Sequence, residues 1–439
     1  MKELVRSAFQ WLADTRLARR VVDTLFGARA RRRIVELDHQ SVARCQNRTL
    51  LGLVHQGHRT RFGRDHDFRR IRNAGDFRRL VPLRTPGELW REYWQPAYPD
   101  LAGATWPGPI PYLAISAATS NVPLPYIPVS LDLWATHQTA ALTALAFVLH
   151  ARPRTRLCTG RLCLVGGGTM LSPAGDPAAA ESLEAIAFRK LSPYLQPYAL
   201  TYPALADRDN GQADNKPLVD LAQRCTRVPV TTLAGSADAL AALLAHAKRL
   251  TGHDCVTSIW PHLAAILYTS STLPLGRSRL LEEVGDPRLL CLEMVLRPEG
   301  AVAIEDPRHR GLRLLPDHGI YFEFVPVDQL DRPRPERLSA AEVKVGVPYA
   351  LAISSPAGVW ACLVGSVVRF ERRDPPLLQL VEAGNLWQQP SFSMPAVAEP
   401  VTAAHAFPAQ PPHRRSAGTP AAHPGTSFRS ALSAHAGRE

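Results

Sequence analysis

The chain has 439 residues, of which 46% are hydrophobic and 21% are charged. This composition is typical of a folded globular protein with a sizeable core, and it excludes collagen-like, disulfide-scaffold and wholly disordered classes. The net charge of +12 comes almost entirely from arginine, which is scattered singly along most of the sequence. A nucleic-acid partner is therefore not expected, because such a partner calls for a localised basic face.

Arginine is concentrated in residues 1–33, where basic residues outnumber acidic ones. Two interpretations fit this segment. One is contact with an anionic surface. The other, which we favour, is the solvated face of an exposed helix.

Cysteine usage and apolar patterning predict a cytoplasmic protein. The seven cysteines are dispersed and form no CxxC pair, which indicates a reducing compartment. The N-terminus lacks the pattern of a signal peptide. The longest apolar segment, Leu133–Leu149, is interrupted by Thr136-His137-Gln138, and its uninterrupted part is too short to cross a bilayer. We therefore expect no membrane span.

Apolar residues at helical spacing predict that residues 3–58 are helical, with a second helix over Ile34–His55. We interpret residues 1–58 as a helical segment that packs on the main domain. The next clear pattern is a strand over Tyr112–Ile115, then a loop over Ser116–Pro128 and a helix over Leu131–His150.

The middle of the chain alternates between strand and helix patterns. Arg161–Val165 predicts a strand that ends in Gly166-Gly167-Gly168, and Glu181–Leu195 is predicted to be helical. Thr231–Leu250 contains a helix that begins after Ser236 or Asp238 and ends at Thr251-Gly252. Further strands are predicted over Ile266–Tyr268, Leu289–Val295, Ala301–Ile304, Ile320–Val327, Pro348–Ser354 and Trp360–Phe370. This order predicts an α/β fold with mixed sheets and an antiparallel, barrel-like part.

The last residues differ in composition from the rest. Residues 389–439 are rich in Pro, Ala, His, Ser and Gly, with almost no aliphatic periodicity, and we expect them to be a disordered tail. The main domain is then predicted to span residues 59–388.

Several motifs follow one another in a recognisable order. They are Thr60-Arg-Phe-Gly-Arg-Asp-His-Asp-Phe68, the Ser/Thr segment at Ile115–Val129, Val295-Leu-Arg-Pro-Glu-Gly300, Gly319-Ile-Tyr-Phe-Glu-Phe-Val-Pro326 and Ala357–Phe370. In order and spacing the chain resembles the auxin-responsive acyl-acid amido synthetases, and the resemblance implies a large domain of the adenylate-forming type. In that family a carboxylic acid is activated with ATP and Mg²⁺ as an acyl-adenylate, and the acyl group then passes to an amino acid.

The resemblance also implies where the site residues lie. The nucleotide site would be lined by Ser116, Thr119, Ser120, Glu299 and Ser366, and the substrate pocket by Gly166, Gly167 and Glu323. Alternatives without a functional role stay open for these residues: Glu299 as an exposed turn residue, Gly166-Gly167 as a turn after a strand, and Glu323 as a structural carboxylate. No catalytic residue and no metal-ligating cluster is assigned.

The chain departs from the family pattern at three places. Alanines, Asn121 and Val122 replace the glycines of the phosphate loop, and Pro125 stands near the expected lysine, which removes donors and stiffens the loop. Ser366 replaces an aspartate that accepts both ribose hydroxyls, a contact that a carboxylate makes best. The family's small mobile C-terminal domain is not expected after 378–385, a segment similar to the hinge, and a separate protein partner is one possible source of it.

These departures favour a catalytically degenerate member of an acid–amino acid ligase family. A small carboxylic acid and an amino acid are the expected partners if activity is retained. The alternative is a non-catalytic relative that binds a small carboxylic acid or a protein partner.

Overall fold

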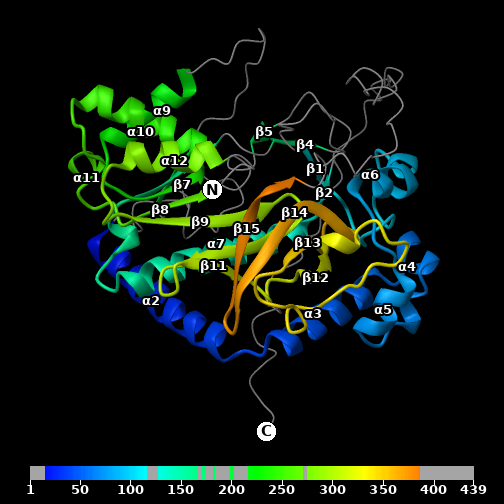
Figure 1. The fold of residues 1–439 in the computed structure, drawn as a ribbon. Coiled ribbons are helices and arrows are strands. Elements are labelled where there is room, and N and C mark those ends of the chain that lie inside the picture. Colours follow the sequence, from blue (N-terminus) through cyan, green and yellow to red (C-terminus); the bar gives the residue numbers. More distant parts are fainter. Residues whose placement is uncertain are drawn as a thin grey trace, which may run out of the picture. The chain divides into compact units, whose positions relative to one another are not determined.

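A mixed sheet of eleven strands organises the chain (Figure 1). The computed structural model describes residues 15–115, 127–166, 170–173, 181–182, 198–201, 216–269 and 274–385. The strand order is β12-β13-β14-β15-β11-β10-β9-β8-β7-β3-β6. These strands are β3 (Arg161–Val165), β6 (Ala199–Thr201), β7 (Val230–Ser236), β8 (Ala265–Thr269), β9 (Leu290–Arg297), β10 (Gly300–Asp306), β11 (Gly311–Leu314), β12 (Tyr321–Pro326), β13 (Pro348–Ser355), β14 (Val359–Arg373) and β15 (Pro376–Asn385).

The sheet has a parallel part and an antiparallel part that meet at β9. The neighbouring strands β6, β3, β7, β8 and β9 pair in parallel. From β9 onward the neighbours β10, β11, β15, β14, β13 and β12 pair antiparallel. A second, antiparallel sheet has the order β2-β1-β4-β5. Its strands are β1 (Tyr112–Ile115), β2 (Ile127–Val129), β4 (Met170–Pro173) and β5 (Glu181–Ser182). The mixed α/β class predicted from the sequence is confirmed.

Helices cover both parts of the large sheet. Helices α9 (Lys216–Thr226), α10 (Ala237–Thr251) and α12 (Pro274–Val284) pack on one another beside the parallel strands, and α7 (Leu131–Ala151) contacts β9 and β10. In Figure 1, α2 (Arg16–His39) runs along the lower edge, and it packs on α7. The remaining helices are α3 (Val42–Gly57), α4 (Arg61–Asp65), α5 (Ala74–Leu80), α6 (Pro86–Leu89) and α11 (Val256–Ile259). None of the described helices is both long and apolar enough to cross a membrane.

Local sequence signals explain several helix boundaries. The Ser236 side chain accepts a hydrogen bond from Ala239 N and starts α10, which ends at Gly252 with a φ of 71°, as the sequence predicts. The single helix predicted over Ile34–His55 is wrong. The helix breaks at Gln40, and Ser41 caps the new helix α3 by accepting from Arg44 N.

Two other segments differ from the sequence-based expectation. Glu181–Ser182 is not helical but forms β5 on β4, and residues 183–195 lie outside the described part. The segment 378–385, interpreted as a hinge, belongs to β15 and pairs with β14. The cysteines are dispersed in sequence but not all in space, since the Cys163 and Cys225 sulfurs lie 3.1 Å apart in a buried position.

Aromatic side chains fill the core under the antiparallel strands. Trp360 is fully buried, stacks on Phe62 with centroids 5.9 Å apart, and meets Phe68 edge-on at 4.7 Å. Its Nε1 donates to the carbonyl of Thr105 (2.9 Å), so the polar end of the ring is satisfied. The last strands and the N-terminal helices therefore share one core.

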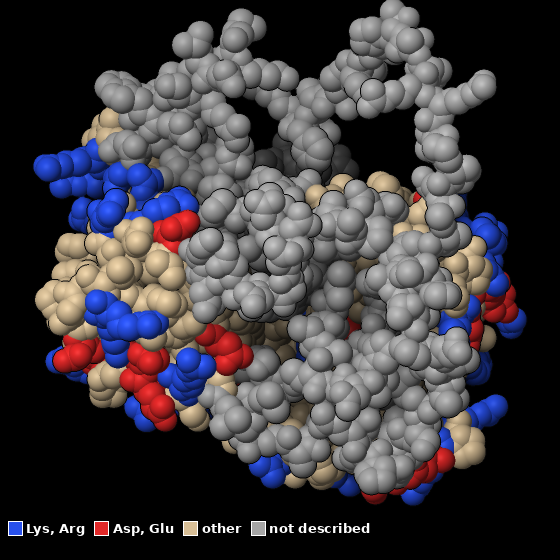
Figure 2. Space-filling model, turned by 90° about the horizontal axis from the view of Figure 1, so that it is seen from above, with Lys and Arg blue, Asp and Glu red and all other residues tan. Residues whose placement is uncertain are grey.

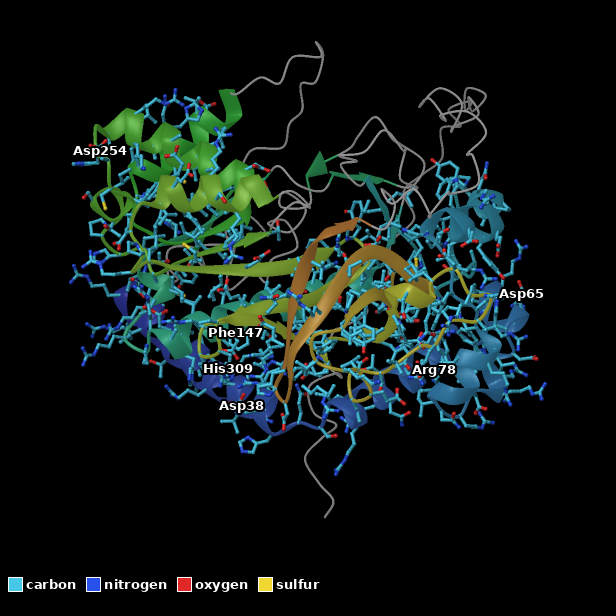
Figure 3. All side chains as sticks on the ribbon, viewed as in Figure 1. Asp38, Asp65, Arg78, Phe147, Asp254 and His309 are labelled. Carbon is cyan, nitrogen blue, oxygen red and sulfur yellow. The ribbon has the colours of Figure 1, made fainter. Side chains whose placement is uncertain are left out.

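Arginines join the N-terminal helix to the sheet. Arg313, 2% exposed, donates to Asp306 (3.1 Å) and to Asp38 on α2 (2.7 Å). Arg308 also pairs with Asp38 (2.6 Å), and its guanidinium lies over the Phe147 ring. Figure 3 marks the two ends of this arrangement, Asp38 and Phe147. The cluster holds α2 against the sheet and α7.

A second ion pair holds α5 against β12. Glu323 is 0% exposed, and both of its oxygens accept from Arg337, with Nε to Oε1 at 3.1 Å. Arg337 also donates to the Val81 carbonyl (2.5 Å), and Arg78 lies 3.5 Å from Glu323. A carboxylate so deeply buried depends on these donors.

Arg337→Leu is expected to lower the free energy of unfolding by about 3–5 kcal/mol, because it leaves the buried Glu323 carboxylate without its main partner. The double variant Arg337→Leu/Glu323→Leu should be more stable than the single one. Guanidinium unfolding measures both. The control Arg32→Ala, which breaks an exposed pair with Glu36, should cost less than about 0.5 kcal/mol. A single variant that is no less stable than the double one would contradict this account.

The Asp38 pair predicts a pH dependence. Burial acts to raise the pKa of Asp38, but hydrogen bonds from Arg308 and Arg313 outweigh it and lower the pKa to about 2. The stabilisation from this carboxylate is therefore present above the unfolded pKa of about 4 and is lost as the pH falls toward 2. The stability difference between the natural chain and Asp38→Asn should shrink over that range. A difference that stays constant in urea titrations would contradict the assignment.

Candidate functional site

The hairpin between β9 and β10 places Glu299 inside the protein. Gly300 pairs with Arg297, so Pro298 and Glu299 form the connecting turn. A Cβ at Gly300 would lie 2.7 Å from Ile320 Cδ1, so a larger residue there would require the Ile320 side chain to move. Glu299 is only 8% exposed. The alternative interpretation of Glu299 as an exposed turn residue is therefore wrong.

Arg297 and Glu299 influence each other electrostatically. Burial raises the pKa of the Glu299 carboxyl, and the nearby Arg297 charge opposes this shift. Burial likewise lowers the pKa of Arg297, while Glu299 acts to raise it. Each group therefore favours the ionised form of the other in a region where burial disfavours both charges.

Ser366 belongs to the same cluster. It lies on β14, is 3% exposed and follows Gly365, whose φ of 72° turns the strand. Arg297 Nη2 donates a hydrogen bond to Ser366 Oγ. Two predicted site residues, Glu299 and Ser366, are thus brought together by Arg297. The sequence analysis did not name Arg297 as a site residue. Its position two residues before Glu299, at the start of the same turn, was a sequence signal that the two side chains could lie close together.

Backbone and hydroxyl contacts link this cluster to the start of α7. Ser355 Oγ donates to the Glu299 carbonyl (2.6 Å) and accepts from Ala357 N (3.2 Å). Ser130, which caps α7, donates to the Pro356 carbonyl (2.6 Å). The β13–β14 turn therefore joins the Glu299 hairpin to the helix that follows the Ser/Thr segment.

The predicted phosphate loop is bounded by described strands. Ser116, Thr119 and Ser120 lie outside the described residues. Strands β1 and β2 on either side of them pair antiparallel, with Ala114 opposite Ile127. The two ends of the loop therefore start from neighbouring strands.

The predicted pocket residues occupy different places. Gly166 directly follows β3 and is partly exposed, while Gly167 lies outside the described residues. Glu323 lies on β12 in the buried pair with Arg337, which is the geometry of a structural carboxylate.

Glu299 and Ser366 do not match the needs of ATP and Mg²⁺ closely. A divalent cation prefers deprotonated carboxylates, but the Glu299 pKa is raised by burial and its charge faces Arg297. Ser366 offers one hydroxyl, which already accepts from Arg297. Within the described ranges no group of three or more His, Cys, Asp or Glu side chains is placed to hold a metal ion.

Ser366→Ala is expected to lower the free energy of unfolding by about 1–2 kcal/mol, because one N–H of the half-buried Arg297 loses its acceptor. Ser366→Thr keeps the hydroxyl and is the matched control, so it should stay closer to the natural chain. Thermal and denaturant unfolding measure the difference. Equal losses in both variants would mean that packing, not the hydrogen bond, matters at this position.

Comparisons with known proteins agree with this architecture. Residues 31–213 match the GH3 family N-terminal domain, and residues 313–382 match the GH3 family central domain. A search of curated proteins found no match.

Solved structures of adenylate-forming ligases share the fold. The acyl acid amido synthetase AtGH3.15 in complex with 2,4-DB is 14% identical with a TM-score of 0.60, covering 81% of this chain and 70% of that one. An open conformation of 2-hydroxyisobutyryl-CoA ligase, in complex with 2-HIB-AMP and CoA, is 15% identical with a TM-score of 0.51, covering 76% and 72%. At this identity the likeness concerns the fold alone. The two domain matches together cover more than half of the sequence, and the chain belongs to the GH3 family.

Proposed function

We propose that this chain is a catalytically degenerate acyl-acid amido synthetase, which has kept the adenylate-forming scaffold but forms acyl-adenylate slowly or not at all. The observation that carries the proposal is the hydrogen bond from Arg297 to Ser366. The family resemblance puts an aspartate at the position of Ser366. A carboxylate there accepts two ribose hydroxyls, whereas the serine hydroxyl is already engaged by Arg297.

The phosphate side of the site supports the same proposal. Adenylation requires the triphosphate to be held in line and its developing charge to be neutralised. In the sequence, glycines that allow backbone N–H groups to approach phosphates are replaced, and Pro125 stands near the expected lysine. If activity is retained, ATP, Mg²⁺, a small carboxylic acid and an amino acid are the expected substrates and cofactors.

A second candidate function is binding of a small carboxylic acid without its activation. Arg297 favours it, since this half-buried guanidinium has further N–H groups besides the one donated to Ser366, and paired N–H groups bind carboxylates strongly. A protein partner at the same site is a less specific form of this idea.

ATP–pyrophosphate exchange over a panel of carboxylic acids tests the proposal. We expect no exchange above that of reactions without the protein, and no rise in melting temperature with ATP and Mg²⁺. Exchange clearly above that background with any acid would overturn degeneracy, and its loss in Glu299→Gln would then assign the activity to this site. A rise in melting temperature with an acid alone, lost in Arg297→Gln, would support the second candidate.

A further inference from the structure

Helix α2 has an apolar stripe on the side that faces solvent. Its inner side buries Ala30, Ile34 and Leu37 against the protein. Its outer side exposes Leu17 (74%), Val21 (51%), Leu25 (66%) and Val35 (57%), which are half of the exposed large hydrophobic side chains in the described part of the chain. At 100° per residue these four fall within about 80° of the helix circumference, opposite the buried residues. The continuous apolar part is Leu17–Val21–Leu25, because the exposed Arg32 lies on the same side before Val35 and pairs with Glu36.

Arginines flank this stripe on both sides. Arg20 and Arg31 lie along one flank and Arg29 along the other, all exposed, and none forms an ion pair with another described residue. The acidic residues of α2 are already engaged: Asp23 accepts from Cys158 N, Glu36 pairs with Arg32, and Asp38 pairs with Arg308. At the margins of the view in Figure 2, where side chains are described, acidic residues lie beside basic ones.

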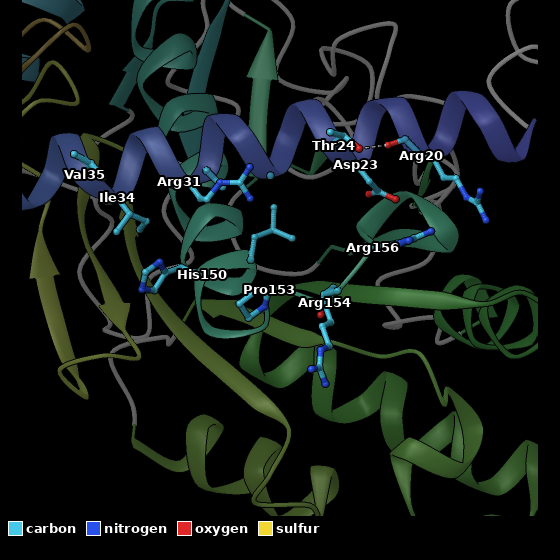
Figure 4. Close-up of a pocket in the computed structure, with 14 residues that line it drawn as sticks. Arg20, Asp23, Thr24, Arg31, Ile34, Val35, His150, Pro153, Arg154 and Arg156 are labelled. Carbon is cyan, nitrogen blue, oxygen red and sulfur yellow. Dashed lines mark hydrogen bonds between the residues drawn. The ribbon is translucent and has the colours of Figure 1, made fainter.

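A groove lies next to the flank of α2 that carries Arg20 and Arg31. It has a volume of about 850 Å³ and is bounded on the other side by residues 149–156, which include the end of α7 and the segment after it. Figure 4 shows Arg20 and Arg31 on the α2 side, with Arg154 and Arg156 on the other segment. Its apolar floor includes Ala30, Ile34 and Leu149, and its one acidic residue is Asp23.

We propose that the outer face of α2 docks on an anionic phospholipid surface. The stripe Leu17–Val21–Leu25 enters the boundary between headgroups and acyl chains, and the four groove arginines contact phosphate groups. An exposed helix with an apolar stripe between basic flanks is the pattern of interfacial binding. The attraction of each arginine to an anionic leaflet adds to the burial of apolar area.

Charge and shape argue against the two other occupants of such a face. A second copy of α2 would place Arg20, Arg29 and Arg31 near the same residues of its partner, and like charges repel. An acidic protein would need a surface complementary to a convex helix, whereas a lipid boundary adapts to it.

Co-sedimentation with vesicles tests the proposal. The whole chain should sediment with vesicles of phosphatidylcholine mixed with an equal amount of phosphatidylglycerol, and not with phosphatidylcholine alone. Binding should weaken as salt is raised. Arg31→Ala and Arg156→Ala should each weaken partitioning by roughly fivefold. Leu17→Ser/Val21→Ser/Leu25→Ser should reduce it by more than tenfold, since three apolar side chains no longer leave water.

The matched control is Leu250→Ser/Leu281→Ser, which removes exposed leucines from α10 and α12 and should leave vesicle binding unchanged. Unchanged circular dichroism and melting temperature show that each variant is folded. Equal sedimentation with neutral vesicles, or full binding by the triple variant, would overturn the proposal. So would salt-sensitive retention on polyglutamate without vesicle binding, which would assign the face to an acidic protein.

Discussion

An arginine that is taken out of water must find acceptors inside the protein. This constraint shapes both the packing of the sheet against its helices and the candidate site. Arg313 joins the sheet to α2 through Asp306 and Asp38, and Arg337 joins β12 to α5 through Glu323. Arg297 does the same between the β9–β10 hairpin and β14. Each depends on partners far away in sequence, so local changes at one of them affect distant segments.

The site follows from the same requirement. The Ser366 hydroxyl accepts a hydrogen bond from Arg297, and Glu299 interacts electrostatically with the same guanidinium. These polar side chains therefore interact with one another inside the shared fold. Fold and activity are separable in this way because the fold rests on the sheet and its aromatic core, while activity rests on a few side chains.

The sequence predicted many elements well and some poorly, for physical reasons. Strands β1 and β3 and the helix α7 were predicted nearly to the residue, because turn residues or a serine cap bound each of them. The break at Gln40 was missed because helical periodicity continues across it and only the cap at Ser41 marks it. The pairing of β14 with β15 and the Arg297–Ser366 contact depend on non-local register, which no local pattern encodes. For the same reason the prediction that Glu299 and Ser366 belong to one site came from the family resemblance and not from a local pattern.

The register of the last described strand, β15, brings the end of the described chain to the candidate site. Asn385 lies opposite Ser366, across one inter-strand spacing of roughly 5 Å. The last described residue is thus held beside a residue of the Glu299 cluster, although nineteen positions separate Asn385 from Ser366 in the sequence.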